Sequence, residues 1–515
     1  MPVEKNHSYV VEITDIASDG RGIGHIDGMT VFVAGAVTGD RAEVMVQRVK
    51  KRFAEGVLNK VIHPSKHRIE PDCPYFGTCG GCQTANIDYP FELAVKAENV
   101  TQAMRRIGGI KDFLLDKISS GSEKHYRNKA VYKIENSVCG FYSEKTHHMI
   151  PIQSCMLCSE KDRDILAVLS EKSENCFGEL FIRRAKNTQQ TMVVVNTEQR
   201  LSNMEELAKE IRKADDSVVS VIFNFLNESV AFGEKVIEDT LMGIKFRISD
   251  KSFYQVNPEM TERLYRKALE YADLTGAERV LDIYCGIGTI SLCAAQQAEF
   301  VTGIEIVPQA IENAKENAKL NGLENTAFYA DSAERIVPKL ISVGERPDVV
   351  ILDPPRKGSD EETLAAIVHA APKRIVYVSC NPATLARDTA FLLQGDYKIT
   401  AAEAFDMFPR TAHVETVVLL CRKTPDDVIK VKLSLDELEL TSAESKATYE
   451  KIKEYVMRNF GLKVSTLYIA QTKRKLGIAM GENYNMPKSI ESTQPQCPPD
   501  KEVAIVKALE HFKMI

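Results

Sequence analysis

The chain has 515 residues, of which 44% are hydrophobic and 27% charged, shares typical of a globular protein rather than a disordered or collagen-like one. At roughly 100–200 residues per domain, this length predicts three or four domains. No apolar run approaches the ~18 residues of a membrane span, and the amino terminus lacks the pattern of a secretory signal, so we expect a cytoplasmic protein without membrane contact. The 66 basic and 72 acidic residues give a net charge of −6, which still allows nucleic-acid binding through a local basic patch.

Residues 1–62 contain short apolar or alternating segments separated by Asp–Gly and Gly–Asp turns. Short strands with such turns predict a small β-barrel of the OB-like kind. The last segment runs into four cations, namely Arg48, Lys50, Lys51 and Arg52. These cations form either a solvated strand end or a phosphate-contacting patch on a nucleic-acid-binding barrel.

Residues 63–250 alternate short strands with helical segments and predict a central α+β domain. Seven of the chain's twelve cysteines fall in this part, and five of them are clustered: Cys73, Cys79, Cys82, Cys155 and Cys158. Clustered cysteines in a cytosolic protein indicate metal binding or catalysis rather than disulfides. Two Cys-x2-Cys pairs predict a tetrahedral zinc site. The first three cysteines with one later cysteine predict a [4Fe–4S] cluster instead, and the spacing leaves both open.

From residue 251 to 423, apolar strands alternate with helices, which predicts a doubly wound, Rossmann-like parallel sheet. The segment 282–288, Asp-Ile-Tyr-Cys-Gly-Ile-Gly, follows the first strand, and Glu305 ends the next one. A carboxylate there can accept both ribose hydroxyls of a nucleotide ligand. Ser291 stands where the dinucleotide pattern has its third glycine. This shorter glycine motif, without the third glycine, favours S-adenosylmethionine over NAD as the ligand. The remaining alternative is that the loop is a purely structural turn.

Three more candidate residues lie at strand ends of the same sheet. Asp353 opens Asp-Pro-Pro-Arg, a stiff loop that either holds a flat base or simply ends its strand. Cys380 follows Ile-Val-Tyr-Val-Ser and precedes Asn-Pro, so we expect it at the ligand edge of the sheet rather than in the core. Glu415 enters the last apolar strand, where a carboxylate is costly unless it has a partner or a function.

A thiol, a carboxylate and a methyl donor together suit methylation of uracil at C5. That carbon is a poor nucleophile, but a thiolate that adds to C6 makes C5 enolate-like and able to accept a methyl group. A base must then remove the C5 proton so that the cysteine can leave. Cys380 and Glu415 are the candidates for these two roles.

The motifs Asp-Ile-Tyr-Cys-Gly-Ile-Gly, Asp-Pro-Pro-Arg-Lys-Gly, Val-Ser-Cys-Asn-Pro and Phe-Pro-Arg-Thr-Ala-His-Val-Glu closely resemble the RNA uracil-5-methyltransferase family, in its 23S rRNA branch. The resemblance covers about residues 1–423 and implies that Cys380 is the nucleophile and Glu415 the base. It also implies a TRAM RNA-binding domain at 1–62. Four residues would contact S-adenosylmethionine: Gln255, Tyr284, Glu305 and Asp353.

The same resemblance favours a [4Fe–4S] cluster over zinc. The cluster would be held by Cys73, Cys79, Cys82 and Cys155, because the family's fourth cysteine follows a Pro-Ile stretch such as Ile-Pro-Ile-Gln-Ser-Cys. Cys158 departs from that pattern. The cluster is expected to be structural or to position RNA, since methyl transfer needs no electron.

Three rival functions stay open. The tRNA T-loop version of the reaction is the nearest, although the barrel and the cysteines favour 23S rRNA as the partner. The others are a catalytically silent RNA-binding assembly factor and an N-methyltransferase, whose Pro-Pro loop would end in an aromatic residue and not in Arg356. A monomer is expected. Residues 424–515 form a separate extension, with helices predicted over 443–461 and 500–512, and no function is assigned to it.

Overall fold

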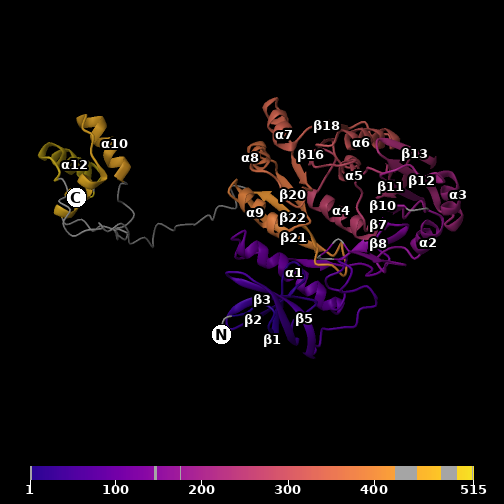
Figure 1. Ribbon diagram of the computed structural model, residues 1–515. Helices are drawn as coiled ribbons and strands as arrows, with labels where there is room; N and C mark the ends of the chain where they lie inside the picture. Colours follow the sequence, from indigo (N-terminus) through magenta and orange to yellow (C-terminus); the bar gives the residue numbers. More distant parts are fainter. Residues whose placement is uncertain are drawn as a thin grey trace. The chain divides into compact units, whose positions relative to one another are not determined.

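The computed structural model describes residues 3–143, 146, 148–173, 176–423, 449–476, 496–512 and 514. The chain divides into two compact units, Met1–Thr424 and Pro425–Ile515. The first unit holds a closed barrel and two large sheets, and three described helices lie in the second (Figure 1). Within the described ranges, no helix has the length and apolarity that crossing a membrane requires.

The amino-terminal barrel closes in the order β1-β2-β3-β5-β4. Its strands are β1 Ser8–Ile16, β2 Gly22–Ile26, β3 Met29–Ala34, β4 Arg41–Val49 and β5 Phe53–His63. The interior is filled by alternate residues such as Val31, Val33 and Val44, which are fully buried. A Cβ at Gly24 would lie 2.3 Å from Val11 Cγ1, so glycine allows β1 and β2 to approach closely. The predicted small barrel is confirmed.

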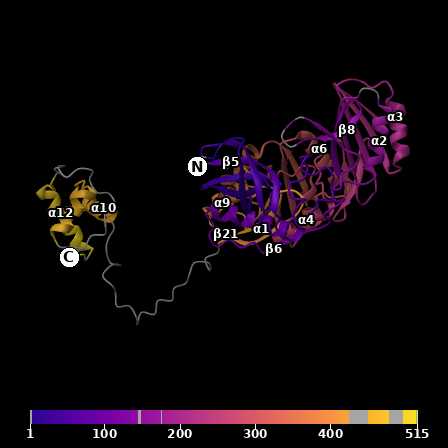
Figure 2. The same cartoon turned by 60° about the horizontal axis from the view of Figure 1, so that its bottom comes forward.

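A seven-stranded sheet follows in the order β13-β12-β11-β10-β7-β8-β9. Its strands are β7 Lys129–Glu135, β8 Val138–Tyr142, β9 Met149–Pro151, β10 Gly178–Arg184, β11 Thr191–Thr197, β12 Val218–Phe225 and β13 Glu228–Gly233. Helices α2 Asp162–Lys172 and α3 Met204–Ala214 pack side by side on one face (Figure 2). Two further strands, β14 Ile237–Leu241 and β15 Ile244–Ile248, form a separate hairpin.

The third sheet has eight strands in the order β18-β17-β16-β19-β20-β22-β21-β6. Its strands are β6 Lys117–Ser119, β16 Arg279–Ile283, β17 Phe300–Glu305, β18 Thr326–Ala330, β19 Val349–Leu352, β20 Arg374–Ser379, β21 Tyr397–Phe405 and β22 Glu415–Arg422. The first five in this order run parallel, and β22 is antiparallel to both of its neighbours. The three-residue strand β6, which comes from a distant segment, thus completes the predicted Rossmann-like sheet, which is confirmed.

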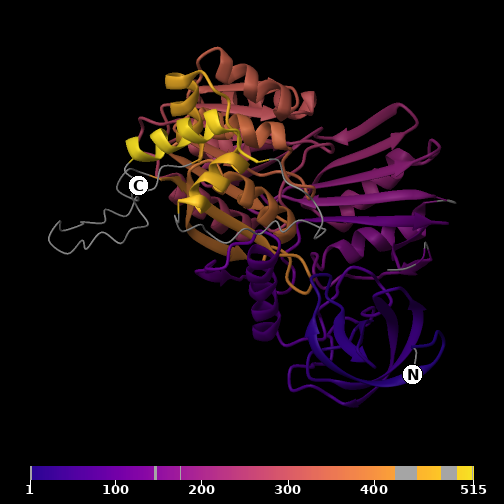
Figure 3. The same ribbon diagram turned by 90° about the vertical axis from the view of Figure 1, so that its left-hand side faces the viewer.

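Helices cover both faces of this sheet. They are α1 Tyr89–Arg106, α4 Pro258–Ala272, α5 Thr289–Ala295, α6 Pro308–Leu320, α7 Ala333–Ser342, α8 Glu361–Ala370 and α9 Pro382–Leu393. On one face α1, α7, α8 and α9 share a core. Phe91 and Val95 of α1 also pack on Ile16 and Val37 of the barrel, so α1 joins the barrel to the sheet (Figure 3).

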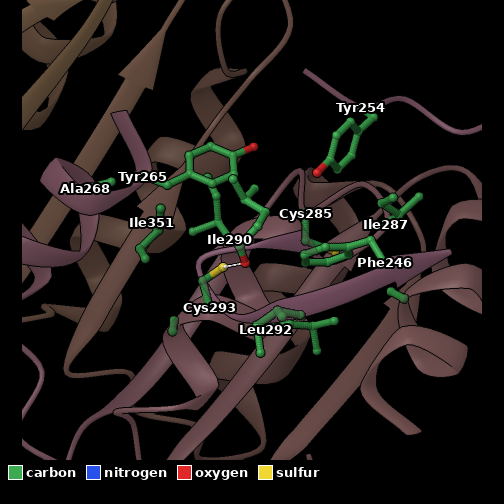
Figure 4. Close-up of a cluster of buried hydrophobic side chains, with 14 of the residues drawn as sticks. Phe246, Tyr254, Tyr265, Ala268, Cys285, Ile287, Ile290, Leu292, Cys293 and Ile351 are labelled. Carbon is green, nitrogen blue, oxygen red and sulfur yellow. Dashed lines mark hydrogen bonds between the residues drawn. The ribbon is translucent and has the colours of Figure 1, made fainter. Parts of the chain in front are cut away.

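The other face packs on α4, α5 and α6 (Figure 4). Tyr265, Ile290 and Cys293 belong to this core, and the Cys293 thiol donates a 3.9 Å hydrogen bond to the Leu241 carbonyl. Cys285 is also buried, with 5% of its surface exposed. Of the cysteines in this sheet's helices and loops, these two are therefore core residues.

The second unit contains α10 Tyr449–Phe460, α11 Thr466–Lys475 and α12 Pro499–His511. They enclose a small core of their own, which includes Ile452, Val456, Ile469 and Ile505. The two predicted helices correspond to α10 and α12, although 443–448 lie outside the described residues. The sequence did not predict α11.

Candidate active site

The candidate donor site lies where the carboxyl ends of β17, β16 and β19 meet. Tyr284 follows β16, Glu305 ends β17 and Asp353 follows β19. Because Ile283 pairs with Leu352 in the sheet register, the residues beyond them leave the sheet at the same level. The strand order reverses between β16 and β19, and ligands of open α/β sheets bind in the crevice at such a point.

The loop after β16 has a backbone that requires glycine. Gly286 and Gly288 have φ values of 56° and 82°, in the left-handed region. Tyr284 also has a positive φ, 71°, and its hydroxyl lies 3.0 Å from that of Ser359. The Gly286 amide donates to the Glu305 carboxylate at 3.3 Å. Glu305 is thus held beside the loop.

Ser291 has a specific role in this loop. Its hydroxyl donates a 2.5 Å hydrogen bond to the Asp282 carboxylate, and both residues are buried. Burial raises the pKa of Asp282 to about 7, the Ser291 hydrogen bond opposes this, and the charge of Asp353 adds to it. A glycine at position 291 could not satisfy this carboxylate.

Gln255 lies in the segment before α4. Its carbonyl accepts a 3.1 Å hydrogen bond from the Asn128 side chain, which ties the segment to the seven-stranded sheet. Among the described residues, the Gln255 side chain makes no hydrogen bond. The structure therefore brings three of the four candidate donor residues together, and the role of Gln255 stays a prediction.

Cys380 and Glu415 lie at the same end of two adjacent strands. Cys380 follows β20 and Glu415 begins β22, and the antiparallel register pairs Ser379 with Thr416. Cys380 and Glu415 each stand one residue beyond that pair. Cys380 is half-buried, whereas only 5% of Glu415 is exposed.

The electrostatics of this pair follow from its burial. Burial raises the pKa of Glu415 to about 8, and the charge of Asp353 adds to this effect. Burial also raises the pKa of Cys380 to about 11, with the charges of Glu415 and Asp353 adding. The Arg356 guanidinium opposes both shifts. The thiol and the carboxyl are therefore mostly protonated at neutral pH unless a further positive charge arrives.

Two residues that the sequence analysis did not assign to the site adjoin this pair. Arg356 Nη2 lies 3.3 Å from His413 Nε2, and partial burial together with the Arg356 charge lowers the pKa of His413. The Arg356 carbonyl accepts hydrogen bonds from Asn381 at 3.0 Å and Thr384 at 3.3 Å. The loop after β19 is thus joined to the turn that carries Cys380. In the sequence, the position of Arg356 directly after the two prolines was the signal that could have identified it as a site residue.

A groove of about 1080 Å³ opens on Cys380. Arg356 and His413 line it at the sheet edge, and barrel residues 15–19 line it on the opposite side. The exposed face of α1 contributes further side chains, among them Glu98, Gln102 and Arg106. Its volume is at the upper end of the range for ligand sites, and the Cys380 thiol lies on its wall.

All five clustered cysteines line a second cavity, of about 720 Å³, and Arg356 and His413 line this cavity as well. Burial raises the pKa of Cys82 to about 12, and the charges of Cys155, Cys73 and Cys79 add to this. A hydrogen bond from the Cys158 thiol lowers the pKa of Cys155 to about 6. Cys158 itself belongs to the core under the seven-stranded sheet. Cys155 is therefore the later thiol whose charge raises the pKa of Cys79 and Cys82.

Within the described residues, no three His, Cys, Asp or Glu side chains stand close enough to hold one metal ion. The predicted [4Fe–4S] or zinc centre is not confirmed. The chemistry of the donor set nevertheless fits an iron–sulfur cluster, because thiolates hold such clusters and all five cysteines line one cavity.

A buried charge network anchors the loop that leads to Glu415. Lys96 of α1 donates to Glu92 and Asp406, each at 2.7 Å. The Arg410 amide donates to Glu92 at 2.8 Å, and Arg410 has a φ of 69°. The Arg410 carbonyl accepts the amide of Gln83, which directly follows the cysteine loop. The loop over 406–413 is thus held between α1 and the cysteines.

Comparisons with known proteins agree with this geometry. The family described as tRNA (uracil-5-)-methyltransferase matches residues 88–423, and the TRAM domain matches residues 2–58. Proteins described as uncharacterized RNA methyltransferases from Halalkalibacterium halodurans and Clostridium tetani are both 40% identical to this chain. The matches cover 81% and 82% of this chain, and 98% and 97% of those proteins.

Among solved structures, the tRNA (uracil-54, C5)-methyltransferase of Pyrococcus abyssi, in complex with S-adenosyl-L-homocysteine, is similar to this chain. It is 27% identical with a TM-score of 0.63, and the match covers 80% of this chain and 100% of that one.

Proposed function

This chain belongs to the tRNA (uracil-5-)-methyltransferase family, and from that membership we propose that it methylates C5 of a uridine in 23S rRNA, with S-adenosylmethionine as the methyl donor. The observation that carries the proposal is the pair of Cys380 and Glu415 at adjacent strand ends, with Cys380 opening on the groove. RNA is the substrate class that the TRAM domain and the family share.

The proposed reaction uses the two side chains in turn. The Cys380 thiolate adds to C6 of the uracil, so that a sulfur–carbon bond forms and C5 gains nucleophilic character. The donor supplies the methyl group to C5 and leaves as S-adenosylhomocysteine. Glu415, as a carboxylate, then removes the C5 proton, and the sulfur–carbon bond breaks to restore the thiolate. The net products are methylated RNA, S-adenosylhomocysteine and one proton.

Arg356 suits the charge changes in this scheme. Its guanidinium lowers the pKa of both Cys380 and Glu415, although burial dominates in each case. It therefore favours the thiolate before attack and the carboxylate before proton removal. We assign it a positioning and electrostatic role.

The donor is proposed to bind at the reversal point of the sheet. The Glu305 carboxylate would accept hydrogen bonds from the ribose hydroxyls of the donor, and Tyr284 and Asp353 would contact the rest of the donor. The fixed carboxylate of Glu305 beside the Gly286 amide supports this assignment. Gln255 is kept as a fourth contact on the family resemblance alone.

We also propose that Cys73, Cys79, Cys82 and Cys155 hold a [4Fe–4S] cluster rather than zinc. Their common cavity and the mutual effect of their charges support this set. When bound, the cluster would supply a rigid centre between the cysteine loop and the segment that carries Cys155. The chain itself joins the cysteine loop to the loop over 406–413 through two backbone hydrogen bonds, in which the Gln83 and Thr84 amides donate to the Arg410 carbonyl.

A tRNA T-loop substrate is the second candidate. The similarity to the Pyrococcus abyssi tRNA enzyme favours it, because that match covers 80% of this chain and so extends beyond residues 88–423. Mapping of 5-methyluridine in rRNA and tRNA, from cells with and without this gene, distinguishes the two. Loss confined to 23S rRNA is expected, and loss confined to tRNA would transfer the proposal to the second candidate.

Trapping experiments on the two proposed catalytic residues test the chemistry. Glu415→Gln keeps the side-chain size but cannot accept the C5 proton, so it should accumulate a denaturation-resistant complex of methylated RNA with Cys380. Cys380→Ala should abolish both methylation and the complex. RNA that contains 5-fluorouridine should trap the wild-type protein, because fluorine cannot leave as a cation. Normal turnover by Glu415→Gln would refute the assigned role.

A further inference from the structure

The segment of the second unit that includes α10 and α11 concentrates positive charge in a chain that is acidic overall. Residues 449–476, which include α10 and α11, contain seven Lys and Arg against two Glu, a net of +5, while the whole chain carries −6. The whole unit over residues 425–515 has 14 basic and 13 acidic residues, a net of +1, so the excess is local to this segment. A local basic patch is an electrostatic feature of nucleic-acid-binding proteins. Neither of the two family matches includes this unit.

The helices α10 and α11 form a helix–turn–helix pair. Gly461, with a φ of 67°, ends α10, and the Ser465 side chain caps α11 by accepting the Tyr468 amide at 3.3 Å. Residues Ile452, Val456 and others pack these helices against α12, which completes the small core. Helix pairs joined by a glycine-containing turn recur in nucleic-acid-binding domains.

A shallow groove of about 720 Å³ lies between the second half of α10 and the start of α11. Its polar lining is Lys453, Glu454, Arg458, Lys463, Ser465 and Thr466. Arg458 and Lys463 are exposed and form no ion pair with any other described residue. Lys475, by contrast, pairs with Glu502 at 2.6 Å. Arg458 and Lys463 thus place two unpaired positive charges at the groove, although other cations of this unit, among them Lys451 and Arg474, also form no ion pair with a described residue.

We propose that this groove, here named the tail groove, binds the phosphate backbone of the substrate RNA as a contact additional to the barrel and the active site. The proposal rests on the proposed function, because RNA is chosen as the partner on the ground that the rest of the chain acts on RNA. Arg458 and Lys463 flank the groove as phosphate ligands, and the amino-terminal end of α11 adds favourable polarity. A tethered second site raises affinity without a new active-site contact.

The test compares matched double variants of the full-length protein. Arg458→Gln with Lys463→Gln removes two charges from the tail groove. Lys501→Gln with Lys507→Gln removes two charges from α12, where each ammonium lies 5.8 Å from an aromatic ring centre. Binding of a labelled uridine-loop RNA hairpin is measured over a range of salt concentrations. The groove variant should lose about 0.7 in the slope of log K against log salt per lost phosphate contact, and the α12 variant should match the wild type.

Two further measurements keep the result unambiguous. Arg458→Lys with Lys463→Arg keeps both charges and should restore the wild-type slope, while circular dichroism verifies that each variant retains its helices. Equal slopes for the groove variant and the wild type would refute the tail groove, as would tighter binding of a DNA hairpin of the same sequence. Methylation assayed on the same preparations separates the two proposals. If the wild type leaves the RNA unmethylated while the groove variant has an altered slope, only the proposed function is refuted.

Discussion

Cys380 and Glu415 illustrate how burial controls chemistry at single residues. With pKa values raised to about 11 and about 8, both groups resist ionisation at neutral pH, and each negative charge would disfavour the other. Arg356 is the cation that lowers both pKa values. The site therefore favours one negative charge at a time, which suits a scheme in which thiolate and carboxylate act in succession.

Alkylation of Cys380 provides a direct test of this coupling. Glu415→Gln removes a negative charge that raises the pKa of Cys380, so the midpoint of the reaction rate with iodoacetamide should move to lower pH. Arg356→Gln removes the opposing positive charge and should move the midpoint to higher pH. Mass spectrometry of the Cys380 peptide over a pH series that extends above 11 measures both, and exposed Glu362→Gln in α8 is the control. Shifts in the same direction would contradict the coupling.

The donor site has its own single-residue prediction. Glu305→Ala should raise KM for S-adenosylmethionine, because each hydrogen bond to a charged acceptor contributes roughly 1.5–3 kcal/mol, or about one to two powers of ten. Glu299→Ala, just before the other end of β17, should leave KM unchanged. Steady-state kinetics with saturating RNA gives both values. An unaltered KM in Glu305→Ala would mean that Glu305 ends β17 without contributing to donor binding.

At this scale the sequence predicted positions better than contacts. Tyr284, Glu305 and Asp353 end neighbouring strands as the alternating pattern indicated, since strand ends follow from local hydrophobicity. The contact of Arg356 with His413 joins residues 57 positions apart and depends on how two loops fold over the sheet. No local pattern encodes such a contact.

Among the elements, α1 has the largest influence on the active-site loop. Its Lys96 is 1% exposed and lies between two carboxylates. Lys96→Met would leave Glu92 and Asp406 buried without this cation, and breaking such a pair costs about 3–5 kcal/mol. Urea unfolding should show this loss, and exposed Lys111→Met should not. A near-neutral Lys96→Met would mean that the network contributes little to stability.

The cysteine loop over 73–82 carries the metal prediction. Anaerobically purified protein should be brown, with broad visible absorption and about four iron atoms per chain. Cys155→Ala should bleach it, whereas Cys158→Ala should keep the colour, because Cys158 lies in the core. Metal analysis and absorption spectra decide the matter. A colourless protein with one zinc would overturn the assignment, and bleaching by Cys158→Ala alone would change the fourth ligand.

For the whole molecule, the barrel and the Rossmann-like sheet were predictable because each is built from contiguous, regular segments. The participation of β6 in the eight-stranded sheet was not, since Lys117–Ser119 is three residues long and pairs with β21 far along the chain. The division at residues 62, 250 and 423 stays a prediction. α11 was missed because its apolar residues are few and four of its ten residues are Lys, Arg or Gln.

The barrel's basic turn predicts how the molecule holds RNA. Arg48 lies 3.4 Å from Glu55, while Lys50, Lys51 and Arg52 are exposed. Neutralising the last three should flatten the salt dependence of RNA binding by about 0.7 in slope per lost contact. Donor binding, measured by calorimetry, should be unchanged. A charge-preserving exchange of Lys for Arg at the same positions is the control, and an unaltered slope would leave this turn as a solvated strand end.

The pairing of β6 with β21 also has a consequence for how the chain folds during its synthesis. Ser119 and Glu403, whose side chains share a 2.7 Å hydrogen bond, are 284 residues apart. A ribosome that adds about 5–20 residues per second needs roughly 15–60 s to make that interval. During this time α1 and β6 have left the ribosome without their partner strand. Until α9 and β21 have been made, the side of α1 that carries Val100 and Met104 therefore lacks its native packing partners, and only Phe91 and Val95 can pack on the barrel.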